Sequence, residues 1–88
     1  MEFEFDSRKA AANLEKHRVS FDEAMTALLD PQALAGEDPD AQGESRWVLI
    51  GLSSEANLLT VVYTLRGDNV RLISARRATS QEVRNYAR

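Results

Sequence analysis

The sequence predicts an α+β fold, with a small, strongly twisted antiparallel sheet, two helices before the sheet and one helix after it. Two observations lead to this prediction. Apolar residues recur at helical spacing before residue 31 and after residue 78, and runs with strand character lie between these two regions. The connections between the later strands are short and contain Gly, Asp and Asn, which is typical of antiparallel hairpins. The predicted order is strand, two helices, a weak strand, three strands and a helix.

The N-terminal region predicts a short strand and a helix. Phe3 and Phe5 alternate with acidic residues, as in a strand with one buried face. The alanine-rich run over 8–17 has high helix propensity. Three of its residues share one face and are expected to point to the core: Ala10, Leu14 and His17.

The second predicted helix is the strongest in the chain. Ser20 and Glu23 have the spacing of a capping box, and Asp30 with Pro31 ends the helix. Between these signals, apolar residues form a complete stripe at helical spacing. The stripe consists of Phe21, Ala24, Met25, Leu28 and Leu29.

The rest of the chain predicts the sheet and the last helix. Residues 32–45, with two glycines, a proline and several acids, predict a loop or a poor edge strand. Strands are expected at 46–53, 58–66 and 70–76, and the first two are apolar on both faces. We therefore expect helices to cover one face of the sheet and a partner to cover the other. Thr79 and Glu82 form a second capping box, which starts a helix that reaches about Arg88.

Length and composition limit the classes of function. Eighty-eight residues predict a single domain over 1–88. With no cysteine and one histidine, the chain lacks the residues for disulfides, thiolate nucleophiles and the usual protein metal centres, so no metal site and no cofactor are expected. The start of the chain has neither a cationic leader nor a long apolar run, which predicts a cytoplasmic protein without membrane contact.

Charge is distributed unevenly along the chain. The first 45 residues carry a net charge of −7, whereas the remaining residues carry +4. All seven cations of the second part are arginines, whose planar guanidinium groups fit phosphate or carboxylate at two points. This pattern indicates an anionic partner for the second part, although the two parts could also neutralise each other in the fold.

Three motifs together resemble the BrnT family, small toxins of bacterial type II toxin–antitoxin modules. They are Phe5-Asp6 leading into Lys9–His17, then Val19–Ala24, and finally Arg71–Thr79 followed by Glu82, Arg84 and Tyr86. The resemblance implies a RelE-like fold and a ribonuclease activity that halts translation. It also implies an antitoxin, called BrnA, that carries a ribbon-helix-helix segment for DNA binding.

One position departs from the family pattern. Arg18 stands where the family usually has glycine after Lys-His. A glycine there would suit a left-handed residue that ends a helix. Arginine would be strained by about 1 kcal/mol or would end the helix differently.

Cleavage of RNA without a metal uses the 2′-OH as nucleophile, so the protein must supply a base, an acid and cations. Arg71 and Arg77 are candidate catalytic cations, because they lie six residues apart and share a strand face. Glu82 is a candidate base or positioning group, or serves only as a cap. His17 is a candidate proton shuttle, because an ordinary histidine titrates near neutrality, or is a structural residue at a helix end.

Four further residues are candidates for RNA binding: Arg66, Arg76, Lys16 and Tyr86. Lys16 could instead face the acidic loop, and Tyr86 could instead pack the last helix on the sheet. The expected assembly holds two toxins and two BrnA-type antitoxins, with DNA bound only through the antitoxin. An alternative function remains open, a non-catalytic module that binds its antitoxin and co-represses the operon.

Overall fold

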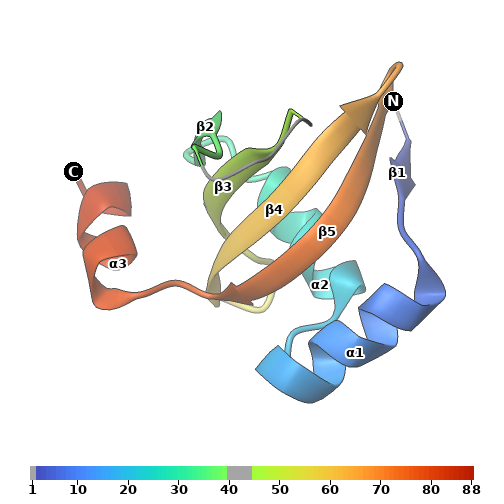
Figure 1. Ribbon diagram of the computed structural model, residues 1–88. Coiled ribbons are helices and arrows are strands. Elements are labelled where there is room, and N and C mark those ends of the chain that lie inside the picture. The colour runs from blue at the N-terminus through green and yellow to red at the C-terminus, as the bar shows by residue number, and fades with distance from the viewer. Residues whose placement is uncertain (1, 40–44) are drawn as a thin grey trace.

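Residues 2–39 and 45–88, which the computed structural model describes, form three helices and five strands (Figure 1). The helices are α1 (Ser7–His17), α2 (Phe21–Leu28) and α3 (Ser80–Tyr86). The strands are β1 (Phe3–Glu4), β2 (Leu34–Glu37), β3 (Trp47–Leu52), β4 (Leu58–Arg66) and β5 (Asn69–Arg77). The predicted α+β fold and order of elements are confirmed. None of the described helices is long and apolar enough to cross a membrane.

The strands form one sheet in the order β1-β5-β4-β3-β2. Neighbouring strands from β2 to β5 are antiparallel, as predicted, but β1 runs parallel to β5, so the sheet is mixed. A hairpin can join only antiparallel strands, but β1 and β5 are not joined by a hairpin. The chain leaves β1 through α1 and α2, and β1 pairs with β5, the last strand, so a parallel arrangement is possible. The predicted loop or edge strand at 32–45 contains β2, an exposed edge strand, while residues 40–44 lie outside the described part.

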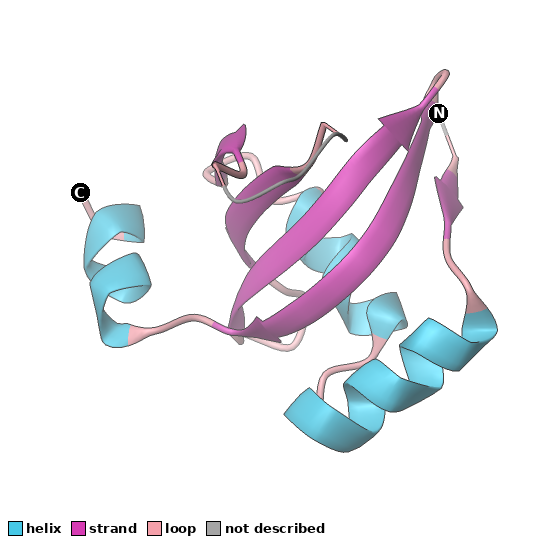
Figure 2. Ribbon diagram, in the orientation of Figure 1, coloured by secondary structure: helices cyan, strands magenta, loops and turns pink. Residues whose placement is uncertain are grey.

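Helices α1 and α2 lie on one side of the sheet, and α3 stands apart from them beyond the end of β5 (Figure 2). The core lies between the sheet and α2. At its centre are Val19, Phe21, Ala24, Ala27, Leu59, Val61, Leu72 and Ala75. Gly51 allows this close approach, because a Cβ there would collide with the carbonyl oxygen of Ala27.

Strand β5 contains a bulge. Val62 and Tyr63 are consecutive on β4, but they pair with Ser74 and Leu72, so Ile73 is an extra residue on β5. An extra residue reverses the alternation of side chains along the strand that carries it.

The bulge changes which arginines share a face. Leu72 before it and Ala75 after it both point to the core. Arg71 and Arg76 therefore share the opposite face of the sheet, and Arg77 points to the side of Ala75. The prediction that Arg71 and Arg77 share a face is wrong, because it counted alternation through an extra residue.

Helix α1 is held against β5 by a buried amide. The side chain of Asn13 accepts a hydrogen bond from the backbone N–H of Ala75 (3.0 Å) and donates to the carbonyl oxygens of Ala75 (2.8 Å) and Val19 (2.9 Å). Strand β1 pairs with β5 only at Val70 and Arg71, and the side chain of Asn13 takes the place of a neighbouring strand further along this edge, at Ala75. The predicted inward face of α1 is wrong at Leu14, which is 48% exposed, because Asn13 takes the buried position.

The end of α1 has the left-handed geometry that strains an arginine, which is one of the two outcomes expected for Arg18. Arg18 adopts a left-handed conformation with φ 60° and ψ 29°. Its N–H donates to the carbonyl oxygen of Leu14 at 2.9 Å. Helix α1 therefore ends directly after His17 in a left-handed residue, and the arginine there has a conformational cost that a glycine would avoid.

Candidate functional site

The face of the sheet that points away from α1 and α2 carries three of the predicted site residues, Arg66, Arg71 and Arg76, and we call it the open face. Its side chains alternate with the core-facing residues of β4 and β5. On β4 and β5, the polar side chains of the open face are Thr60, Thr64, Arg66, Asn69, Arg71, Ser74 and Arg76.

An ion pair between Arg76 and Glu82 joins the open face to α3. The two guanidinium Nη atoms of Arg76 contact the two carboxylate oxygens of Glu82 at 2.7 and 3.1 Å. Glu82 Oε1 also accepts hydrogen bonds from the Thr60 hydroxyl (2.9 Å) and from the backbone N–H of Thr79 (2.8 Å). The predicted capping box between Thr79 and Glu82 is confirmed, and it is part of this larger network.

These contacts determine the protonation of Glu82. The hydrogen bond from Arg76, helped by those from Thr79 and Thr60, lowers the pKa of Glu82 from 4.5 to about 2, against the opposing effect of burial. The same bond raises the pKa of Arg76. A carboxylate with such a low pKa and both oxygens engaged has little tendency to accept a proton near neutrality. This geometry suits a residue that positions Arg76 better than a general base.

Arg71 lies on the same face at the other end of β5. Its Nη1 contacts Glu4 Oε1 at 3.2 Å, because the parallel pairing of β1 places Glu4 beside it. Four residues of strand, one of them the extra residue of the bulge, separate Arg71 from Arg76, which places their backbones about 15 Å apart. The two guanidinium groups therefore lie at separate places on the open face.

Arg77 belongs to a different network, near the β3–β4 turn. Its Nη1 donates to Asn57 Oδ1 at 2.8 Å, and Asn57 Nδ2 donates to Glu23 Oε2 at 2.8 Å. The hydroxyl of Ser53 donates to the same Glu23 oxygen at 2.6 Å. Of the two hydrogen bonds of the capping box predicted at Ser20, only one is present. Ser20 accepts from the backbone N–H of Glu23, but the carboxylate of Glu23 turns to Ser53 and Asn57.

A shallow hollow between α1 and the bulge of β5 brings Lys16 and His17 together. Its volume is about 230 Å³. The lining residues are Lys9, Ala12, Asn13, Lys16, His17, Ile73 and Ser74. No carboxylate is among these seven, and none of the salt bridges between described residues involves Lys9, Lys16 or His17. Sequence reasoning missed Lys9 and Ser74, although Lys9, Asn13 and Lys16 have the spacing of one helix face.

The two remaining predicted residues lie far from this hollow or already have a partner. Arg66 is exposed at the β4–β5 turn, at the opposite end of β4 from Thr60, which pairs with Arg76. The Tyr86 hydroxyl donates to Asp30 Oδ2 at 2.6 Å, and this hydrogen bond raises the pKa of Tyr86. The contact ties the end of α3 to the region after α2. Across the described ranges, no three Asp, Glu or His side chains are grouped as a metal ion would need.

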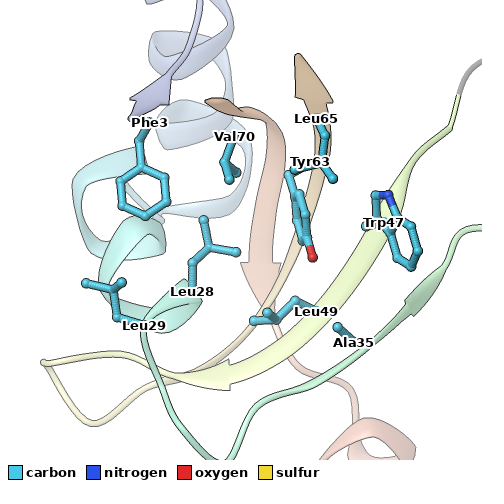
Figure 3. Close-up of a pocket in the computed structure, with 9 residues that line it drawn as sticks. All are labelled: Phe3, Leu28, Leu29, Ala35, Trp47, Leu49, Tyr63, Leu65 and Val70. Atoms are coloured by element: carbon cyan, nitrogen blue, oxygen red, sulfur yellow. The ribbon is translucent and has the colours of Figure 1, made fainter. Parts of the chain in front are cut away.

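An apolar hollow of about 370 Å³ lies on the other face, beside the C-terminal end of α2 (Figure 3). Phe3, Leu28 and Leu29 form one side of it, and Trp47 and Ala35 lie across from them. Leu49, Tyr63, Leu65 and Val70 complete the lining. Leu29 is 69% exposed at the rim. Uncovered apolar surface thus occurs on the helix-covered face, where the sequence did not lead us to expect it.

Comparisons with known proteins agree with this description. The model of a family described as "Ribonuclease toxin, BrnT, of type II toxin-antitoxin system" matches residues 5–82. Among solved structures, the ribonuclease toxin BrnT of Brucella abortus is similar, with a TM-score of 0.67 and 23% sequence identity. The similarity covers 91% of this chain and 99% of that one, and at this identity it shows the shared fold. A search of curated proteins finds no match.

Proposed function

This chain belongs to the BrnT family of ribonuclease toxins of type II toxin–antitoxin systems, and we propose that it cleaves RNA without a metal ion and thereby inhibits translation. Its site of action is then the cytoplasm, where messenger RNA is translated. A BrnA-type antitoxin neutralises it by binding.

One observation carries the choice of site. The bulge in β5 turns Ser74 to the open face, so that the hollow holding His17 adjoins the face that carries Arg76. Arg76 stabilises the charge that develops on the phosphate, while His17 transfers the proton. The 2′-oxygen forms a bond to the adjacent phosphorus, the bond to the 5′-oxygen breaks, and one proton passes from the 2′-OH to the leaving oxygen.

The other predicted residues take supporting roles in this proposal. Glu82 holds the guanidinium of Arg76 at two points and fixes its orientation. Arg71 and Arg66 contact phosphates further along the RNA. Arg77, exposed at the end of β5, has donors beyond the one that binds Asn57, and it contacts RNA that passes this end of the sheet.

The apolar hollow is where we place the antitoxin. An uncovered apolar surface that includes Trp47, Tyr63 and Leu29 is typical of a protein-binding site, and the partner in this family of modules is the antitoxin. Pairing of the ribbon-helix-helix segments gives two toxins and two antitoxins. DNA is bound through those segments only.

The activity is tested with purified protein and a defined RNA, with and without EDTA. We expect cleavage that EDTA leaves unchanged and products that end in a 2′,3′-cyclic phosphate. Intact RNA under both conditions, with normal growth of cells that express the folded protein, would favour the non-catalytic module that binds its antitoxin and co-represses the operon. Co-expression with the neighbouring open reading frame, followed by mass measurement of the complex, tests the partner.

A further inference from the structure

We propose that the hollow between α1 and β5 is a phosphate subsite for single-stranded RNA, in which Lys9 and Ser74 act together with Lys16 beside His17. This inference rests on the proposed function and deepens it, because it gives the RNA backbone a defined path over the protein. It also assigns roles to Lys9 and Ser74, which the sequence did not single out.

The charge of the hollow points to an anion. The whole chain has fourteen acidic residues against eleven basic ones, yet the lining includes two lysines and a histidine without a carboxylate. Neither Lys9 nor Lys16 makes a side-chain hydrogen bond or ion pair with the described residues. An anion bound in the hollow would be attracted by both lysines, because no carboxylate of the lining neutralises them.

The helix that carries the two lysines is anchored on the sheet. Lys9, Asn13 and Lys16 follow one face of α1, and three hydrogen bonds fix the amide of Asn13 against Ala75 and Val19. The two lysines therefore lie about one turn of helix to either side of a rigid anchor. A ligand that binds between them meets a preformed surface.

The bulge connects this hollow to Arg76. Ser74 lines the hollow and shares the open face with Arg76, two residues away along the strand, or about 7 Å. The Ser74 hydroxyl can donate to a phosphate oxygen. Consecutive phosphates of a single strand can thus lie at the hollow, which His17 lines, and at Arg76.

The lining favours the RNA backbone over the bases. Reading a base needs a free amide or an aromatic platform, and the amide of Asn13 is already engaged on both its oxygen and its nitrogen. Lysine ammonium groups act as mobile point charges, which suit phosphates of any sequence. The subsite therefore contributes affinity and position without sequence preference.

The test compares two neighbouring cations of α1. Lys9 lines the hollow, whereas Arg8, also exposed in the first turn, does not. Binding of a fluorescent single-stranded RNA with 2′-O-methyl groups, which resists cleavage, is measured by anisotropy over a range of salt concentrations. For Lys9→Ala we expect about fivefold weaker binding at 0.1 M salt and a salt slope smaller by about 0.7. Arg8→Ala should keep the slope of the wild type.

Cleavage of unmodified RNA, measured in parallel, separates this inference from the proposed function. Equal effects of Lys9→Ala and Arg8→Ala, or no binding by the wild type, overturn the subsite even if the wild type cleaves RNA. A loss specific to Lys9→Ala in a protein without cleavage activity overturns the proposed function and leaves the subsite standing. Ser74→Ala should weaken binding without changing the salt slope, because it removes a donor and no charge.

Discussion

The cations on the two sides of the bulge of β5 differ in one respect: Arg76 is held by a carboxylate, although its side chain stays 41% exposed, whereas Lys9 and Lys16 have no such partner among the described residues. Arg76 binds Glu82 at two points, and the pKa of that carboxyl falls to about 2. The lysines lie around a hollow with no carboxylate in its lining. Engaged groups keep a fixed geometry, whereas groups without partners keep their capacity for a ligand. The contrast is consistent with the proposed division of roles. Glu82 holds Arg76 in a fixed orientation toward the phosphate that is cleaved, whereas the lysines of α1 bind RNA and His17 transfers the proton.

Replacement of Arg76 should have the largest effect. We expect Arg76→Ala to slow RNA cleavage by about a thousandfold, because it removes a contact to the developing charge and frees Glu82 at the same time. Single-turnover cleavage rates measure this effect. Arg84→Ala removes the same charge from the exposed side of α3 and should leave the rate almost unchanged. Equal rates for the two variants would move the active site away from the open face.

His17→Ala tests the other side of the bulge. We expect cleavage to slow by about a hundredfold, since general acid–base catalysis contributes at least this much. The melting temperature should change little, because the part of α1 that is locked to the sheet is Asn13 and not His17. An unchanged rate would return His17 to a structural role at the helix end.

Glu82→Gln sharpens the contrast between positioning and proton transfer. Glutamine can still fill the capping box, so α3 should keep its start. If Glu82 only positions Arg76, the rate should fall by about tenfold, and the pH profile of cleavage should keep its shape. A fall of a thousandfold together with a lost limb of the pH profile would instead identify Glu82 as the base.

The same variant reports on stability as a function of pH. The pKa of Glu82 is lowered on folding from its ordinary value of 4.5 to about 2, so the unfolded chain takes up the proton first as the pH falls. The stabilisation is therefore complete above about pH 5 and is lost as the pH falls toward 2. Thermal melts should show the wild type above Glu82→Gln at pH 7, with the difference shrinking through this window. A difference that stays constant would contradict the ion pair as its source.

The smallest effect is expected at Arg18. Glycine adopts the left-handed conformation at the end of α1 without strain, so Arg18→Gly should stabilise the protein by up to about 1 kcal/mol. The greater conformational entropy of glycine in the unfolded chain reduces this gain. Cleavage should stay at the level of the wild type, because Arg18 does not line the hollow. Denaturant melts and cleavage rates check both points. A destabilised variant would show that the arginine side chain contributes contacts that outweigh the strain.

Local signals were enough to predict most of the fold. The capping box at Thr79 starts α3, and the three long strands lie within one residue of their predicted bounds. The predicted apolar stripe of the second helix lies in α2 except for Leu29, which follows the helix and is 69% exposed. Each of these features depends on neighbours within a few positions. The parallel pairing of β1 with β5 was not predicted, because Phe3 and Val70 are far apart in the chain and no local sequence signal links them.

The site was harder to predict because it depends on one extra residue. Nothing in the run from Arg71 to Arg77 marks Ile73 as the extra residue of a bulge, so simple alternation grouped Arg71 with Arg77. The pairing of Asn13 with Ala75, which are 62 positions apart, likewise has no local signal. Residue types and motifs therefore supplied the candidates, and only the three-dimensional structure showed which of them meet.

The amide of Asn13 also affects how this protein behaves at high concentration. A strand edge with free N–H and carbonyl groups is a template on which a second chain can add its own strand, and such additions lead to aggregates. At Ala75 both groups are already bound by a side chain of the same molecule. An incoming strand would have to displace a buried amide before it could pair with β5 there, so Asn13 protects this edge against self-association.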